Sequence, residues 1–140
     1  MEIIIIGHLE DGPEGSTGEG SWIRFRTMQL EGMARLITRG KDAGTLALGT
    51  RLFVEAGYDL VDKFELVSSH CEDMLEQGAT TGSYVVIGRV VQAWPDRVVI
   101  VRVHDMSIMI KVPDDVPAEP SQGTRLKFYL LGLSLWDIHA

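Results

Sequence analysis

The sequence predicts a mainly β protein with two small five-stranded β-barrels in tandem, joined by one short helix. The first reason is a repeated segment, since Gly49-Thr50-Arg51-Leu52 returns as Gly123-Thr124-Arg125-Leu126. The second reason is that short hydrophobic runs with strand periodicity follow one another in the same order around each copy. Glycine-rich or proline-rich turns separate these runs, as is typical of small all-β domains.

In the first half, Ile3 to Ile6 is a run of four β-branched residues, which predicts a strand that is buried on both faces. Gly7 follows it, and a glycine-rich acidic loop covers 11–21. The alternation from Trp22 to Leu30 then predicts a strand with two distinct faces. Further strands are expected at 33–38, 50–54 and 60–67.

The middle of the chain predicts a short helix near 69–77. Ser69 is followed three residues later by Glu72, the pattern of a capping box, and Cys71, Met74 and Leu75 would share one helical face. The second half has strand patterns at 84–94, 97–104, 107–112, 124–131 and 133–138, with a hairpin turn at Pro95-Asp96. The expected boundaries are 1–68 for the first barrel, 69–82 for the helix and linker, and 83–140 for the second barrel.

The two halves can be aligned by residues as well as by order. Gly7 matches Gly88 inside each first strand, and Arg26 matches Arg102 near the end of each second strand. A glycine in a long first strand lets that strand coil sharply enough to join both sides of a closed barrel. This arrangement resembles the OB-fold, and a similar strand count leaves an SH3-like barrel as the alternative.

Composition narrows the classes of function. The chain has 140 residues, 45% of them hydrophobic, and a net charge of −7. A single cysteine, Cys71, excludes an internal disulfide and fits a reducing compartment. The start of the chain has neither the charge nor the length of a signal peptide, so a cytoplasmic protein without membrane contact is expected. The sequence contains no nucleophile elbow, phosphate loop or dinucleotide fingerprint. We therefore expect a protein that is not an enzyme and that binds neither a cofactor nor a metal ion.

The clearest candidate binding face is on the strand that begins at Trp22. Its outer side would carry Trp22, Arg24 and Arg26, and further cations follow nearby in sequence: Arg35, Arg39 and Lys41. In an OB barrel this surface stacks bases and contacts backbone phosphates, which suggests a module that binds single-stranded nucleic acid. The alternative is a protein-interaction module, such as an acidic inhibitor or immunity-type protein, that uses the same face. Self-association is a further expectation.

Overall fold

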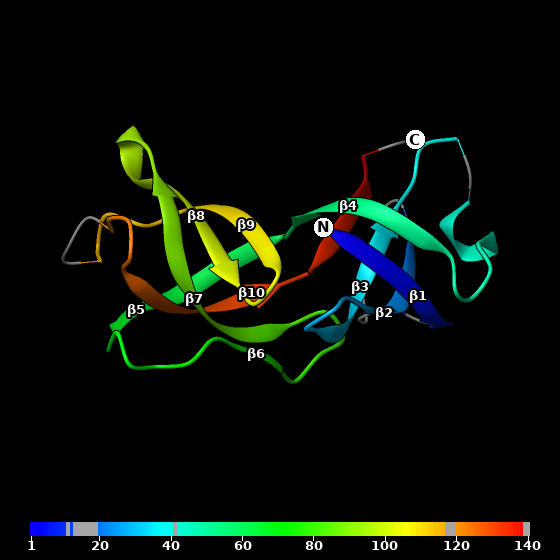
Figure 1. Cartoon of the computed structure of the whole chain (residues 1–140), viewed down its shortest axis with the longest axis horizontal. Helices are drawn as coiled ribbons and strands as arrows, with labels where there is room; N and C mark the ends of the chain where they lie inside the picture. Colours follow the sequence, from blue (N-terminus) through cyan, green and yellow to red (C-terminus); the bar gives the residue numbers. More distant parts are fainter. Residues whose placement is uncertain (11, 13–19, 41, 117–119, 139–140) are drawn as a thin grey trace.

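A computed structural model of the chain describes residues 1–10, 12, 20–40, 42–116 and 120–138. Two sheets lie side by side along its long axis (Figure 1). The strands are β1 (Glu2–His8), β2 (Ser21–Arg26), β3 (Glu31–Ile37), β4 (Arg51–Gly57), β5 (Leu60–Val67), β6 (Met74–Gln77), β7 (Tyr84–Ala93), β8 (Val98–Val103), β9 (Met106–Lys111), β10 (Arg125–Leu131) and β11 (Ser134–Asp137). Two 3₁₀ turns, η1 (Ala43–Thr45) and η2 (Pro95–Arg97), complete the described elements.

The first sheet is a closed barrel with the strand order β1-β2-β3-β11-β4. The second sheet has the order β5-β10-β7-β8-β9, with β6 paired to β7, and it does not close. The predicted β class and one closed barrel are therefore confirmed, but a second closed barrel is not. At the open seam, the Tyr58 hydroxyl in the bend after β4 lies near the backbone of Lys111 at the end of β9.

The last strand of each half pairs with the other half. β5 follows β4 but pairs with β10, whereas β11 follows β10 and lies between β3 and β4. The expectation that each of these strands completes the barrel of its own half is wrong. The physical reason is visible at the connectors, where β4 and β5 continue across both sheets as one bent ribbon (Figure 1). The N–H of Asp59 donates to Leu131 at 2.9 Å, so the two connectors pass against each other.

The helix expected near 69–77 is absent from that part of the structure. The segment turns at Ser68 to Cys71 and then forms β6, which pairs antiparallel with Tyr84 to Ile87 of β7. An isolated helix of this length is marginal in water. The unpaired edge of β7 offers backbone hydrogen bonds instead, because β8 pairs only with the later part of that strand.

The repeated segments have the same geometry in both halves. Gly49 and Gly123 both have positive φ, +88° and +94°, a region that favours glycine. The N–H of Gly49 donates to Ile5 at 2.7 Å, and the N–H of Gly123 donates to Val90 at 2.8 Å. Each turn thus joins a fourth strand to the first strand of its own half.

This equivalence corrects the alignment of the first strands. A register shift follows Ile5 in β1 and Val90 in β7, so Gly7 corresponds to Gln92 rather than to Gly88. Gly88 has a different role, because a Cβ there would lie 2.5 Å from the Val101 side chain. The match of Arg26 with Arg102 holds. Arg26 pairs with Ile4 and Arg102 pairs with Arg89, and each partner is the residue just before Ile5 or Val90, where the register shift begins.

The run Ile3 to Ile6 alternates instead of being buried throughout. Ile3 and Ile5 are fully buried, whereas Ile4 and Ile6 are half-buried on the outer side of the barrel. The expectation of burial on both faces is therefore wrong for Ile4 and Ile6. A strand of a small barrel has only its inner face in the core, and among the described residues no second layer covers the outer face of β1.

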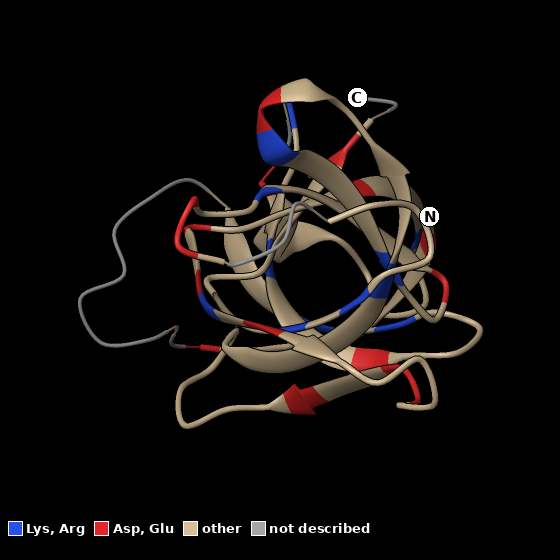
Figure 2. Cartoon of the chain, turned by 90° about the vertical axis from the view of Figure 1, so that its left-hand side faces the viewer, with Lys and Arg blue, Asp and Glu red and all other residues tan. Residues whose placement is uncertain are grey.

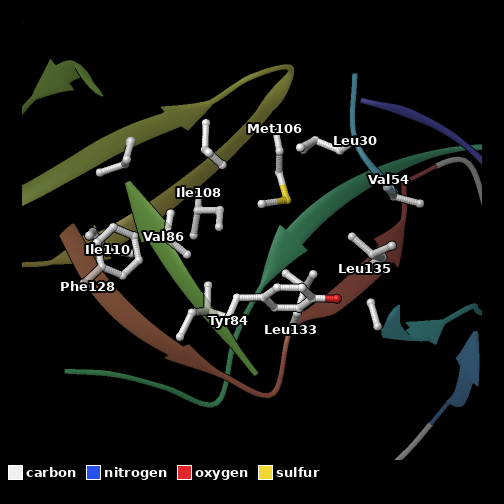
Figure 3. Close-up of a cluster of buried hydrophobic side chains, with 14 of the residues drawn as sticks. Leu30, Val54, Tyr84, Val86, Met106, Ile108, Ile110, Phe128, Leu133 and Leu135 are labelled. Carbon is white, nitrogen blue, oxygen red and sulfur yellow. The ribbon is translucent and has the colours of Figure 1, made fainter. Parts of the chain in front are cut away.

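One continuous hydrophobic core joins the two sheets. Figure 3 shows Leu30, Val54 and Leu135 of the first barrel close to Met106 and Leu133. Tyr84 projects from β7 toward the first barrel, and its hydroxyl accepts the Met33 N–H at 2.6 Å and donates to the Met33 carbonyl at 2.7 Å. The phenol thereby satisfies both backbone groups of Met33, as a neighbouring strand would.

Candidate functional site

The face predicted on β2 has the expected alternation. Ile23 and Phe25 are fully buried, while Arg24 and Arg26 are exposed on the outer side. Trp22 is half-buried, and its indole packs against backbone on two sides. A Cβ at Gly12 would lie 1.9 Å from the indole nitrogen, and one at Gly82 would lie 2.4 Å from Cζ3. The ring thus fixes the segment before β7 against the first barrel, a structural contact that occupies surface a base would need.

The other predicted cations are not gathered into one site. The Arg35 guanidinium lies 3.5 Å from the Asp59 carboxylate and is largely buried. Arg39 is exposed beyond the end of β3, and Lys41 lies outside the described residues. Arg26 is in register with Glu31 on β3, and Arg24 is in register with Met33. The exposed cations that remain on this face are Arg24 and Arg26. Glu31 lies opposite Arg26, and Glu2 and Asp105 line the same hollow as Arg26.

A stronger surface feature is apolar and lies on the outer side of β4 and β11. Phe53, Trp136 and Ile138 are 47%, 46% and 48% exposed, which is high for side chains of this size. They are neighbours, because the Ile138 N–H donates to the Phe53 carbonyl at 3.1 Å and Trp136 pairs with Glu55, two residues further along β4. We call these three residues the Trp136 patch.

Two hollows flank the Trp136 patch. One, of about 300 Å³, is lined by Trp136 and Ile138 together with Arg39 and Glu55. The other, of about 320 Å³, lies between β4 and the β8–β9 hairpin and is lined by Glu55 and Met109 among others. Glu55 is exposed, lines both hollows, and makes no ion pair with a residue that the structure describes. An apolar patch beside hollows and a carboxylate is typical of a protein contact surface.

A second unpredicted feature is a line of arginines on the outer side of the second sheet. Arg125 of β10 is in register with Arg89 of β7, which is in register with Arg102 of β8. We call these three residues the arginine row. Like charges directly opposite on neighbouring strands are destabilising, so the row is unusual.

One carboxylate contacts the arginine row. Asp73 forms an ion pair with Arg125 and also accepts the backbone N–H of His104 at 2.8 Å. Burial of the Asp73 carboxyl raises its pKa, but the His104 N–H and the Arg125 guanidinium outweigh that effect and leave the pKa below its ordinary value. Asp73 is therefore a carboxylate over the whole neutral range.

The sequence contains signals for the arginine row but none that is specific to the Trp136 patch. The repeated Gly-Thr-Arg-Leu segment contains Arg125, and the match of Arg26 with Arg102 marks an equivalent outer position. Neither signal says that these arginines are neighbours, because register is set by pairing. The Trp136 patch had no signal beyond apolar residues at a strand end, which core packing would also explain.

In the part of the chain that the structure describes, we find no further charged cluster or metal site. Seen from the end formed by the second sheet, basic and acidic positions both occur around the molecule (Figure 2). Among the described residues, no group of three or more His, Cys, Asp or Glu side chains could hold a metal ion. No helix within the described part of the chain is long and apolar enough to cross a membrane.

Comparisons with protein-family models, with characterised proteins and with solved structures found no match for this chain. The assignment of function therefore depends on the surfaces described above.

Proposed function

We propose that this protein is a non-enzymatic protein-interaction module that binds its partner through the Trp136 patch. The observation that carries the proposal is the contiguity of three large apolar side chains, each about half exposed, on one side of the closed barrel. Tryptophan and phenylalanine are enriched among residues that dominate binding energy, and they act best beside pockets that exclude water. The two hollows beside the patch provide such surroundings.

Glu55 favours a different protein over a second copy of this chain. Glu55 lines both hollows beside the patch. In a symmetric dimer, residues near the twofold axis face their own copies, which would bring two such carboxylates together. A partner with a lysine or arginine next to an apolar side chain matches this surface better.

The test is affinity capture from an extract of the source cells, followed by titration of the purified partner. Wild-type protein is compared with Trp136→Ala and with Leu66→Ser. Leu66 is also exposed, but it lies near the far end of β5 in the other sheet (Figure 1). Loss of a central aromatic side chain should weaken binding by roughly 30-fold or more, whereas Leu66→Ser should have little effect.

Three results would count against the proposal. A partner that binds Trp136→Ala as tightly as the wild type would place the contact elsewhere. Equal loss with Leu66→Ser would indicate general destabilisation of the fold. Sedimentation that shows a wild-type dimer, dissociated by Trp136→Ala, would make the occupant a second copy of the chain.

A second candidate function is binding of single-stranded nucleic acid by the first barrel. Its support is the strand order β1-β2-β3-β11-β4, with β3 and β11 parallel, which agrees with an OB-like barrel, together with exposed Arg24 and Arg26. The packing of Trp22 removes the strongest stacking group. Titration of a thymidine oligomer tests this candidate, because Arg24→Ala should lower the slope of log affinity against log salt by about 0.7.

We also propose that the two halves are copies of one ancestral unit. The support is the matched turn at Gly49 and Gly123, the matched register shifts after Ile5 and Val90, and the same pairing of the first four strands in each half.

A further inference from the structure

We infer that the arginine row formed by Arg89, Arg102 and Arg125 is a binding site for a phosphate group. The three residues occupy one line across β10, β7 and β8. Neighbouring strands lie about 4.8 Å apart, so the line spans roughly 10 Å. Guanidinium groups at this spacing can approach one oxyanion together, and their planar donors match its oxygens.

The side chains of the row point away from the core. Each lies next to a fully buried residue in its strand: Arg89 beside Val90, Arg102 beside Val101. The Arg102 Nε donates to the His104 carbonyl at 3.1 Å, which orients its guanidinium. Arg89, at the centre, is exposed and makes no side-chain hydrogen bond or ion pair with the residues that the structure describes. Its donors are available to a ligand.

Asp73 links the two outer strands of the row. Its carboxylate forms an ion pair with the Arg125 guanidinium and accepts the His104 N–H at the same time. These two interactions connect β10 with the turn after β8. In the described part of the chain, Asp73 is the carboxylate that forms an ion pair with the row, and it neutralises one of the three charges. The excess positive charge is local, since the chain as a whole has a net charge of −7. A bound oxyanion would relieve the repulsion that remains.

The first half of the chain contains a natural control for this site. At the equivalent register, Arg51 of β4 and Arg26 of β2 flank Ile4 of β1. The outer pair of arginines is thus present in both halves, but the central position is isoleucine in one and arginine in the other. Arg51 lies 3.6 Å from Glu2, so its charge is also partly neutralised. The central arginine is what distinguishes the second row.

The phosphate could belong to a free nucleotide or to the backbone of single-stranded nucleic acid, and calorimetric titration separates the two. The probes are sodium phosphate, thymidine monophosphate and a thymidine oligomer, each at low and moderate salt. Affinity that is similar for the monophosphate and the oligomer indicates a terminal phosphate. Much tighter and strongly salt-dependent binding of the oligomer indicates backbone phosphates.

The decisive variant is Arg89→Ile, which gives the second row the composition of the first. Arg89 is exposed, so the variant should fold, and circular dichroism checks this. We expect Arg89→Ile to weaken binding of the phosphate probe about 10-fold or more, because charge-assisted hydrogen bonds are lost. In the oligomer titration, the salt slope should fall by about 0.7.

The matched control is Arg51→Gln, which removes a cation at the position of the first half that is equivalent to Arg125. It should leave the affinity within about twofold of the wild type. Equal losses in Arg51→Gln and Arg89→Ile would overturn the inference, because they would indicate a general charge effect. Absence of binding by all three probes at low salt would also overturn it. Trp136→Ala should keep phosphate binding, so this test is independent of the proposed protein contact.

Discussion

The two halves of the molecule share one strand arrangement and differ in how it is completed. In the first half, β11 lies between β3 and β4 and closes the barrel. In the second half, β5 pairs with β10 alone, and at the seam toward β9 the Tyr58 hydroxyl lies near the backbone of Lys111. The comparison shows that whether a sheet closes depends on which strands its last strand pairs with. The first four strands, which are arranged alike in both halves, do not decide it.

The halves also differ in what they present to solvent. The closed barrel carries the Trp136 patch, part of which is supplied by the exchanged strand β11. The open sheet carries the arginine row, whose outer members have counterparts in the first half. Equivalent backbones thus carry different surfaces, one apolar and one cationic. The following variants test how far the equivalence and the difference extend.

The largest effect is expected from Ile5→Asp compared with Ile4→Asp. Ile5 is fully buried, so an unpaired carboxylate there would cost several kcal/mol, comparable with the whole stability of a domain, about 5–15 kcal/mol. Ile4 is half-buried and in register with Arg26 and Arg51, so a carboxylate there gains cationic neighbours. Circular dichroism should show Ile5→Asp unfolded and Ile4→Asp folded. Failure of both to fold would show that the outer face is also part of the core.

The next largest effect compares the two exchanged strands. Leu135 of β11 is fully buried, so Leu135→Ala should lower the free energy of unfolding by about 2–5 kcal/mol. Val61 of β5 is half-buried in the open sheet, so Val61→Ala should cost roughly 1 kcal/mol. Urea denaturation measures both. Equal costs would mean that closure does not concentrate stability in the first barrel.

The contact between the halves is tested by Tyr84→Phe. Removal of the hydroxyl leaves the N–H and carbonyl of Met33 without their partner, at a cost of about 1–3 kcal/mol. Tyr58→Phe is the control and should cost less, because the Tyr58 hydroxyl is less buried and has one backbone partner. A negligible effect of Tyr84→Phe would show that the sheets are held together by apolar packing alone.

The same residue predicts a dependence on alkaline pH. Burial raises the pKa of Tyr84, while the Met33 N–H acts in the opposite direction. The unfolded chain therefore loses the phenolic proton first, and stability should fall as pH rises above about 10. Thermal unfolding between pH 9 and roughly 11 should show a shallower decline for Tyr84→Phe than for the wild type.

The smallest effects compare the repeated turns. Gly49 and Gly123 have nearly the same positive φ, and a Cβ at either position would meet no atom within 4 Å. Each alanine substitution should therefore cost about 1–2 kcal/mol, from backbone strain alone. Urea denaturation should give equal values for the two. A large cost at one turn and none at the other would show that the turns contribute differently despite their matched hydrogen bonds.

Much of the candidate site could not be read from the sequence. The alternation on β2 correctly placed Arg24 and Arg26 outside, because period-two patterning depends on local geometry. It also placed Trp22 outside, but could not show that the remote Gly82 would pack against the indole. Arg35 was expected to bind a partner, but its guanidinium forms an ion pair with Asp59. In each case a segment distant in sequence decided what the side chain contacts.

The sequence by itself determined the β class, most strand positions and the two equivalent turns, because hydrophobic periodicity and glycine conformation are local properties. Tertiary structure decided the rest. Strands pair through backbone groups that every residue carries, so nothing in 60–67 or 133–138 specifies which sheet each joins. Backbone pairing also explains why the segment expected to be a helix forms β6 instead, because its backbone groups pair with an edge of β7 that is otherwise unpaired. Register across such pairings then brought Arg89, Arg102 and Arg125 into one row.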